Sequence, residues 1–269
     1  MALIVLASAT GAPGVTTTTL AMALAWPRPV VLVEADPAGG SAIMAGYLRG
    51  EVPHDRGLVN LAMAHRHGED LTAALPEVLV RLPNSTVDLL PGVRLHAQAA
   101  SLAPVWEPLV AVLSDLDRTG TDVLVDAGRL GMLGAPTPLL AAADAVLLVT
   151  RTHLPALAGA RPWAKTLRDD LAASGAESRL ALVLVGQGHP YSAREVRTVL
   201  NLPVAASVAW DAVSAETFHL GAAPGRRFEH GALARSVRAA VSAVQAMATT
   251  NRDRLTPSGR VDDVEGVLT

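Results

Sequence analysis

The sequence has no cysteine and very few aromatic residues. The lack of cysteine in the 269 residues excludes disulfides, thiolate zinc sites, cysteine nucleophiles and cysteine-ligated iron–sulfur clusters. Aromatic residues account for only 3% of the chain, whereas 50% of the residues are hydrophobic. Alanine, leucine and valine must therefore supply most of the contacts in a large core.

The sequence also lacks a long apolar run, a basic leader and an excess of positive charge. No uninterrupted stretch approaches the ~20 apolar residues of a membrane span. Residues 1–8 are apolar, but they carry no basic residue and run into a glycine-bearing loop, which favours a buried strand over a signal peptide. The net charge of −3 argues against nucleic acid as the main partner. We expect a cytoplasmic protein without a membrane span.

Apolar runs alternate with helical patterns along most of the chain. Seven short runs rich in valine, leucine and isoleucine have the composition of strands covered on both faces: residues 2–7, 30–35, 87–90, 122–125, 145–149, 180–185 and 204–209. Helical patterns occupy residues 18–25, 71–82, 108–116, 157–173, 194–200 and 231–248. The alternation predicts an α/β fold with three layers, in which helices cover both faces of a doubly wound, mostly parallel sheet of about seven strands.

This pattern indicates one domain followed by a tail. Residues 1–248 contain all of the predicted elements, with no internal repeat. Residues 249–269 mix polar residues, proline and glycine without apolar periodicity, so we expect a disordered tail there.

A glycine-bearing loop follows the first predicted strand and leads into a helix. Its residues are Gly11, Ala12, Pro13, Gly14, Val15, Thr16 and Thr17. Such a loop binds anions, because backbone N–H groups converge on a phosphate and the helix dipole adds about half a positive charge. Threonine hydroxyls in the first helical turn suit Mg²⁺ and a phosphate oxygen.

This loop resembles the deviant Walker A motif of the ParA/MinD family, SIMIBI-class P-loop ATPases whose pattern is Lys-Gly-Gly-x-Gly-Lys-Thr-Thr. Gly11, Gly14, Thr16 and Thr17 match that pattern, and Ala12 replaces a glycine. The resemblance extends in order to about residue 248. It implies the P-loop NTPase fold and ATP or ADP with Mg²⁺ as ligands.

Both lysines of the motif are missing from this sequence. Thr10 stands where the family's signature lysine reaches across the dimer, and Val15 stands where the other lysine contacts the β- and γ-phosphates. A lysine about 4 Å from a phosphate charge contributes roughly 4 kcal/mol at an effective dielectric constant near 20. After desolvation we expect a loss of about 10²-fold or more in affinity. Three alternatives remain open: a degenerate loop that holds no nucleotide, weak or partner-assisted binding, and slow hydrolysis.

The resemblance assigns acidic residues to two later segments. Asp36 matches the second acidic residue of the family's switch I segment, near the attacking water and the metal, so it is the candidate catalytic residue. Glu34 replaces the usual first aspartate. Asp126 ends an apolar strand and resembles the Walker B aspartate that reaches Mg²⁺ through water. The implied magnesium ligands are Thr16, Asp36 and Asp126.

Two further residues are implied on the base side of the nucleotide. Gln187 follows the sixth predicted strand, where the family carries an asparagine that reads adenine, and Asp211 is the remaining residue of a Pro-x-Asp pattern after the seventh. Trp210 has two interpretations, packing on a purine or filling the core. We expect the core position, because tryptophan is highly buried on average.

The resemblance implies a positioning or regulatory protein of the partitioning, septum-site, or secretion and pilus type. We expect it to act through protein–protein contacts at the switch surface, residues 36–40 and 126–133, with weak or absent nucleotide binding and possible homodimerisation. One alternative is a slow Mg²⁺-dependent ATPase. Another is non-specific DNA binding through Arg235 and Arg238, which share one face of the last helical pattern.

Overall fold

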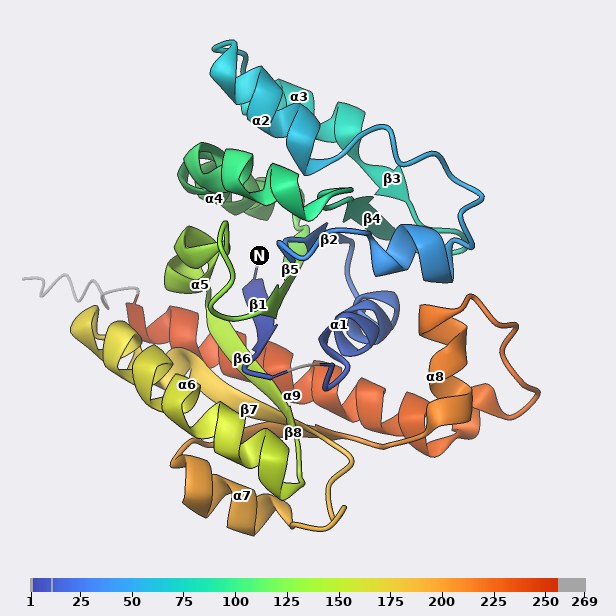
Figure 1. Cartoon of the computed structure of the whole chain (residues 1–269), viewed down its shortest axis with the longest axis vertical. Coiled ribbons are helices and arrows are strands. Elements are labelled where there is room, and N and C mark those ends of the chain that lie inside the picture. The colour runs from blue at the N-terminus through green and yellow to red at the C-terminus, as the bar shows by residue number, and fades with distance from the viewer. Residues whose placement is uncertain (1, 11, 256–269) are drawn as a thin grey trace, which may run out of the picture.

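The computed structural model describes residues 2–10 and 12–255, without the side chains of residues 254 and 255. An eight-stranded sheet runs through it in the order β3-β4-β2-β5-β1-β6-β7-β8 (Figure 1). The strands are β1 (Leu3–Ser8), β2 (Val30–Glu34), β3 (Val80–Arg81), β4 (Val87–Leu90), β5 (Asp122–Arg129), β6 (Ala145–Arg151), β7 (Leu180–Val185) and β8 (Val204–Val208). Neighbouring strands are parallel except for the β3–β4 pair. The predicted α/β class is confirmed.

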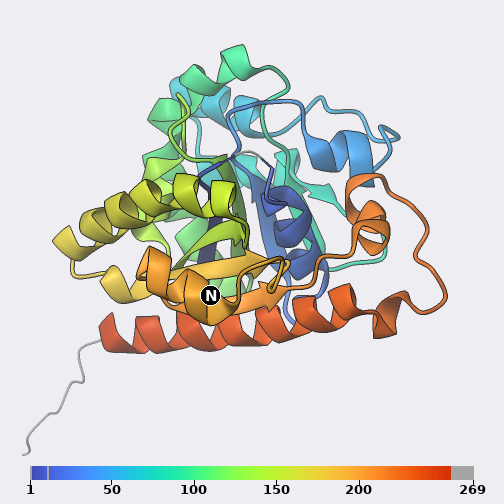
Figure 2. The ribbon, with the colours of Figure 1, turned by 60° about the horizontal axis from the view of Figure 1, so that its bottom comes forward.

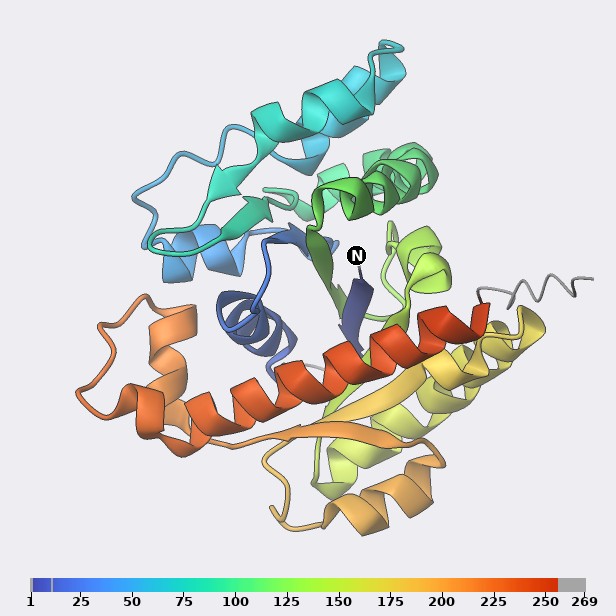
Figure 3. The same ribbon diagram turned by 180° about the vertical axis from the view of Figure 1, so that it is seen from behind.

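Helices cover both faces of this sheet, each over its own hydrophobic cluster. One face carries α2 (Leu58–Arg66), α3 (Leu71–Val78), α4 (Trp106–Asp115), α5 (Thr137–Ala142), α6 (Leu154–Ala173) and α7 (Ala193–Leu200). The other carries α1 (Val15–Leu24), α8 (Ala212–His219) and α9 (Ala232–Leu255). Figures 2 and 3 show α9, in red, crossing that face from the side of α8 to the end of α6. The three predicted layers are therefore present.

Element boundaries differ from the predicted ones at three places. Helix α1 starts at Val15, at the loop itself, rather than at residue 18. The helix predicted over residues 71–82 ends at Val78, because Leu79 is extended and Val80 pairs with Leu89 of β4. A two-residue edge strand has too few positions to show any periodicity, so the sequence pattern missed β3.

The last helix is longer than predicted. Helix α9 continues to Leu255, so the first seven residues of the predicted disordered tail, 249–255, are helical. Ala248 is buried, and the Asn251 side chain donates to the backbone oxygen of Asp144 over 3.0 Å. These long-range contacts favour helix where the local sequence shows no apolar periodicity. Residues 256–269 lie outside the described residues.

One helical stretch of the described chain, His96–Thr119, is long and apolar enough to cross a membrane by length and composition. It includes α4, and its Leu102, Trp106 and Leu109 are part of the buried cluster on the α4 face of the sheet. Of its most apolar window, 39% is buried inside the described structure.

Asp122, at the start of β5, is a buried anchor for the N-terminal strand. Its Oδ1 accepts a hydrogen bond from the Ala2 N–H over 2.6 Å, and its Oδ2 accepts one from the Trp26 indole over 2.8 Å. Arg28 lies 3.5 Å from Oδ1. The carboxylate therefore ties together the starts of two adjacent strands and the end of α1.

Replacing Asp122 with asparagine is expected to lower the free energy of unfolding by about 1–2 kcal/mol. An amide retains only one acceptor oxygen, so one of two N–H donors loses its partner, and the ion pair with Arg28 is lost. Urea unfolding followed by circular dichroism measures the change. The matched control is Asp115→Asn on exposed helix surface, and equal destabilisation by the two substitutions would contradict the anchoring role.

Candidate functional site

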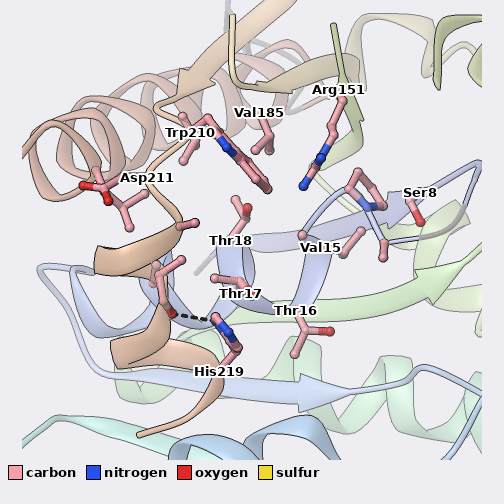
Figure 4. Close-up of a pocket in the computed structure, with 18 of the residues that line it drawn as sticks. Ser8, Val15, Thr16, Thr17, Thr18, Arg151, Val185, Trp210, Asp211 and His219 are labelled. Atoms are coloured by element: carbon pink, nitrogen blue, oxygen red, sulfur yellow. Dashed lines mark hydrogen bonds between the residues drawn. The ribbon is translucent and has the colours of Figure 1, made fainter. Parts of the chain in front are cut away.

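A cavity opens at the carboxyl edge of the sheet, where the chain leaves β1. Strand β1 lies between β5 and β6, and the connections that follow these strands diverge at this point, which is where open α/β sheets bind ligands. The cavity has a volume of about 640 Å³. Figure 4 shows its walls: the start of α1, the ends of β6 and β7, and the segment leading into α8.

The predicted phosphate loop forms one wall of this cavity. Ala12 and Gly14 have φ angles of 50° and 97°, the left-handed conformation that turns backbone N–H groups inward in an anion-binding loop. Helix α1 begins directly afterwards, with Thr18 N–H donating to the Gly14 oxygen over 2.9 Å. Val15 also lines the cavity, but its side chain is buried and carries no charge. The loop thus offers backbone dipoles and a helix N-terminus without an ammonium group. Gly11 is outside the described residues.

The three predicted magnesium ligands lie together beside the loop. The Thr16 hydroxyl lies near the Asp126 carboxylate, where it favours the charged form, and the Gly128 N–H donates to Asp126 Oδ1 over 3.0 Å. Gly128 has a φ of 60°, and a Cβ there would overlap the Asp36 carboxyl group, so Asp36 packs directly on this backbone. Two carboxylates and a hydroxyl are oxygen ligands of the kind that Mg²⁺ prefers.

Burial raises the pKa values of two acidic residues here, Asp126 of this group and Glu34 near it. It raises the pKa of Asp126 to about 6, with the charge of Asp36 adding to the increase. It raises the pKa of Glu34 to about 7, opposed by the hydrogen bond from Ser41. Glu34 accepts that hydrogen bond over 2.5 Å, and Gly92 N–H donates to it over 3.3 Å. Glu34 therefore fastens the end of β2 to neighbouring loops and lies outside the cavity lining.

The base side of the cavity differs from the expectation. Trp210 is 50% exposed and lines the cavity, so the prediction of a core position was wrong. Asp211 also lies in the lining, but its carboxylate caps α8, accepting from Ser214 N–H over 3.0 Å and from Ser214 Oγ over 2.6 Å. These hydrogen bonds lower the pKa of Asp211. Gln187 is exposed and lies outside the cavity lining.

Comparison with solved structures identifies the fold. The cell-division ATPase MinD of Pyrococcus furiosus superposes with a TM-score of 0.71 at 20% identity, covering 92% of this chain and 100% of its own. MinD of Pyrococcus horikoshii in complex with Mg-ADP gives 0.69 at 18%, covering 93% and 99%. A ParA-family ATPase of Chlorobium tepidum gives 0.66 at 18%, covering 91% and 99%. The chain has the fold of the MinD and ParA ATPases. No family model and no curated protein matches the sequence.

Thr10, which the sequence resemblance aligns with the signature lysine, has a packing role in the structure. Its methyl group fills the gap left by Gly159 in α6, where a Cβ would overlap it. The Thr10 side chain is therefore held against its own subunit.

Sequence reasoning did not single out the two arginines that line the cavity, Arg129 and Arg151. Arg129 ends β5 and Arg151 ends β6, so both belong to the carboxyl edge of the sheet, where the cavity opens. A polar residue at the end of an apolar strand, the pattern that drew attention to Asp126, also marks Arg151 as a candidate, but only the strand order places it at the cavity.

The two arginines suggested for DNA binding make local contacts on the described part of α9. Arg238 pairs with Glu229 at 3.1 Å, and Arg235 donates to the backbone oxygen of His230 over 2.7 Å. Exposed pairs of this kind are typical of a solvated helix surface.

Proposed function

We propose that this chain is a cytoplasmic positioning or regulatory protein of the MinD/ParA type that acts through protein–protein contacts and binds Mg-nucleotide weakly. The observation that carries the proposal is a cavity of about 640 Å³ at the glycine-bearing loop, which presents Val15 where the resemblance calls for a lysine. Backbone N–H groups and the dipole of α1 attract phosphate, but they supply only about half a positive charge.

The proposed partner surface consists of residues 36–40 and 126–133. Two of its residues, Asp36 and Gly128, line the cavity and pack against each other. A ligand in the cavity would therefore change the contact between them. Within this surface Leu133 is a large apolar side chain that is 82% exposed. A partner that covers Leu133 would therefore gain from burying it.

Titration of Mg-ATP and Mg-ADP into the purified protein tests this proposal. We expect dissociation constants on the order of 100 µM to 1 mM and no change in sedimentation coefficient on addition of nucleotide. The matched variant is Thr16→Val, which keeps the side-chain volume and removes the hydroxyl. Nucleotide binding by this variant should no longer depend on Mg²⁺. Capture of Mg-ATP in the low micromolar range, or a monomer-to-dimer shift driven by ATP, would refute weak binding.

A slow Mg²⁺-dependent ATPase is the second candidate. The contacts among Thr16, Asp36 and Asp126 favour it, because they bring together the groups that would hold a metal and orient water. Phosphate release above background in the titration samples, and its loss in Asp36→Asn, would favour this enzyme function over the purely regulatory one.

A further inference from the structure

Two arginines flank the phosphate loop, one on each neighbouring strand. In the sheet, Ser8 at the end of β1 is in register with Arg129 of β5 on one side and with Val149 of β6 on the other. Arg151 follows two residues after Val149. Both arginines therefore start from the edge at which the loop leaves β1, and both line the cavity.

The Arg151 guanidinium has no ionic partner among the described residues. Its Cζ lies 3.7 Å from the centroid of the Trp210 ring, and its Nε is buried without a hydrogen-bond partner within the described chain. Figure 4 shows the side chain reaching from its strand along Trp210 toward the Val15 and Thr18 side of the cavity. A guanidinium with a buried, unused N–H group is set up to receive an anion, because leaving such a donor unpaired is unfavourable.

The rest of the chain offers the cavity little other positive charge. The sequence contains a single lysine, Lys165, which lies on α6 paired with Asp169. The arginines that line the cavity are Arg129 and Arg151, and the lining also contains His219 and the carboxyl groups of Asp36, Asp211 and Glu216. Besides the dipole of α1 and any bound Mg²⁺, these two guanidinium groups are therefore the main source of counter-charge for a phosphate in the loop.

We propose that Arg151, assisted by Arg129, is the phosphate-binding cation of this cavity, in place of a lysine from the loop. Its planar fork suits bidentate contact with a phosphate, which is stronger than its present contact with a ring. Movement of Arg151 to the phosphate frees one face of Trp210 for a base. The proposal rests on the proposed nucleotide binding and names the residues responsible for it.

The test compares Arg151→Ala, Arg151→Lys and Arg129→Ala with the control Arg194→Ala, an exposed arginine on α7. Isothermal titration uses three probes: Mg-ATP, inorganic tripolyphosphate and adenosine. We expect Arg151→Ala to weaken Mg-ATP and tripolyphosphate by about 10- to 30-fold, Arg151→Lys and Arg129→Ala by about 3- to 10-fold, and Arg194→Ala not at all. Adenosine affinity should not fall in Arg151→Ala.

Tryptophan fluorescence gives a readout that a merely structural role would not produce. Tripolyphosphate should change the emission of the unsubstituted protein as the guanidinium leaves the ring, and Trp210→Phe or Arg151→Ala should abolish the change.

The outcomes distinguish failure of this inference from failure of the proposed function. Unchanged Mg-ATP affinity in folded Arg151→Ala and Arg151→Lys would overturn the inference and leave the function standing. Binding of tripolyphosphate that depends on Arg151, without any binding of Mg-ATP, would overturn the function and support the inference. No binding of either probe up to about 5 mM would overturn both.

Discussion

Val15→Lys is expected to raise the affinity for Mg-ATP about 100-fold in an Arg151→Ala background, and about tenfold in the otherwise unchanged chain. Val15 is the first residue of α1 and lines the cavity, so a lysine there starts at the phosphate loop. An ammonium about 4 Å from a phosphate gains roughly 4 kcal/mol at an effective dielectric constant near 20, part of which desolvation removes. The gain is smaller when Arg151 already neutralises part of the charge.

The difference between these two gains is measured by calorimetric titration of Mg-ATP into four proteins: the unsubstituted chain, Val15→Lys, Arg151→Ala and the double variant. Val15→Met is the matched control, because it lengthens the side chain without adding charge and should leave affinity unchanged. Equal gains from the lysine in both backgrounds would show that Arg151 and Val15 do not serve the same phosphate. Phosphate release in the unsubstituted protein that already equals that of Val15→Lys would remove the basis for the regulatory interpretation.

Glu34→Gln is expected to change the pH dependence of stability. The folded-state pKa of Glu34 is about 7, against 4.5 for the free side chain, because burial disfavours its charged form. The folded state therefore binds the proton more tightly than the unfolded state does. This contribution to stability is fully present below about pH 4.5 and is lost as the pH rises through 7. By linkage the loss is about 3 kcal/mol.

Glutamine resembles the protonated carboxyl group and does not titrate, so the variant lacks this loss. Relative to the unsubstituted protein, its free energy of unfolding should rise by about 3 kcal/mol between pH 4.5 and pH 8. Some pH dependence remains, because the pKa of Asp126 is also raised, to about 6. Urea unfolding at several pH values in EDTA measures the effect, with the exposed Glu77→Gln as control. A constant difference between the two proteins across this range would contradict the buried, protonated Glu34.

The two acidic residues near the end of β2, Glu34 and Asp36, have different roles: one is structural and the other lines the cavity. Sequence resemblance placed Glu34 and Asp36 together after the second strand, and the structure separates them. Glu34 is buried and bonded to Ser41 and Gly92, whereas Asp36 lines the cavity and packs on Gly128. Side chains two residues apart on an extended segment point the same way only while the strand continues, and β2 ends at Glu34.

The sequence by itself determined the fold class, the position of the phosphate loop and the absence of lysine from it. Continuous apolar runs, a glycine-bearing loop and residue identity are local properties, and each could be read without knowing the contacts. Asp126 was found for the same reason, since it ends a predicted strand before a glycine.

Only the tertiary structure decided which residues face the cavity. Arg129 and Arg151 are 22 positions apart in sequence and meet the loop because β5 and β6 pair with the two edges of β1. Trp210 is exposed and Gln187 lies outside the cavity lining because loop conformation, rather than composition, directs side chains after a strand ends. Strand order and loop geometry depend on contacts between distant residues, so no local pattern in the chain encodes them.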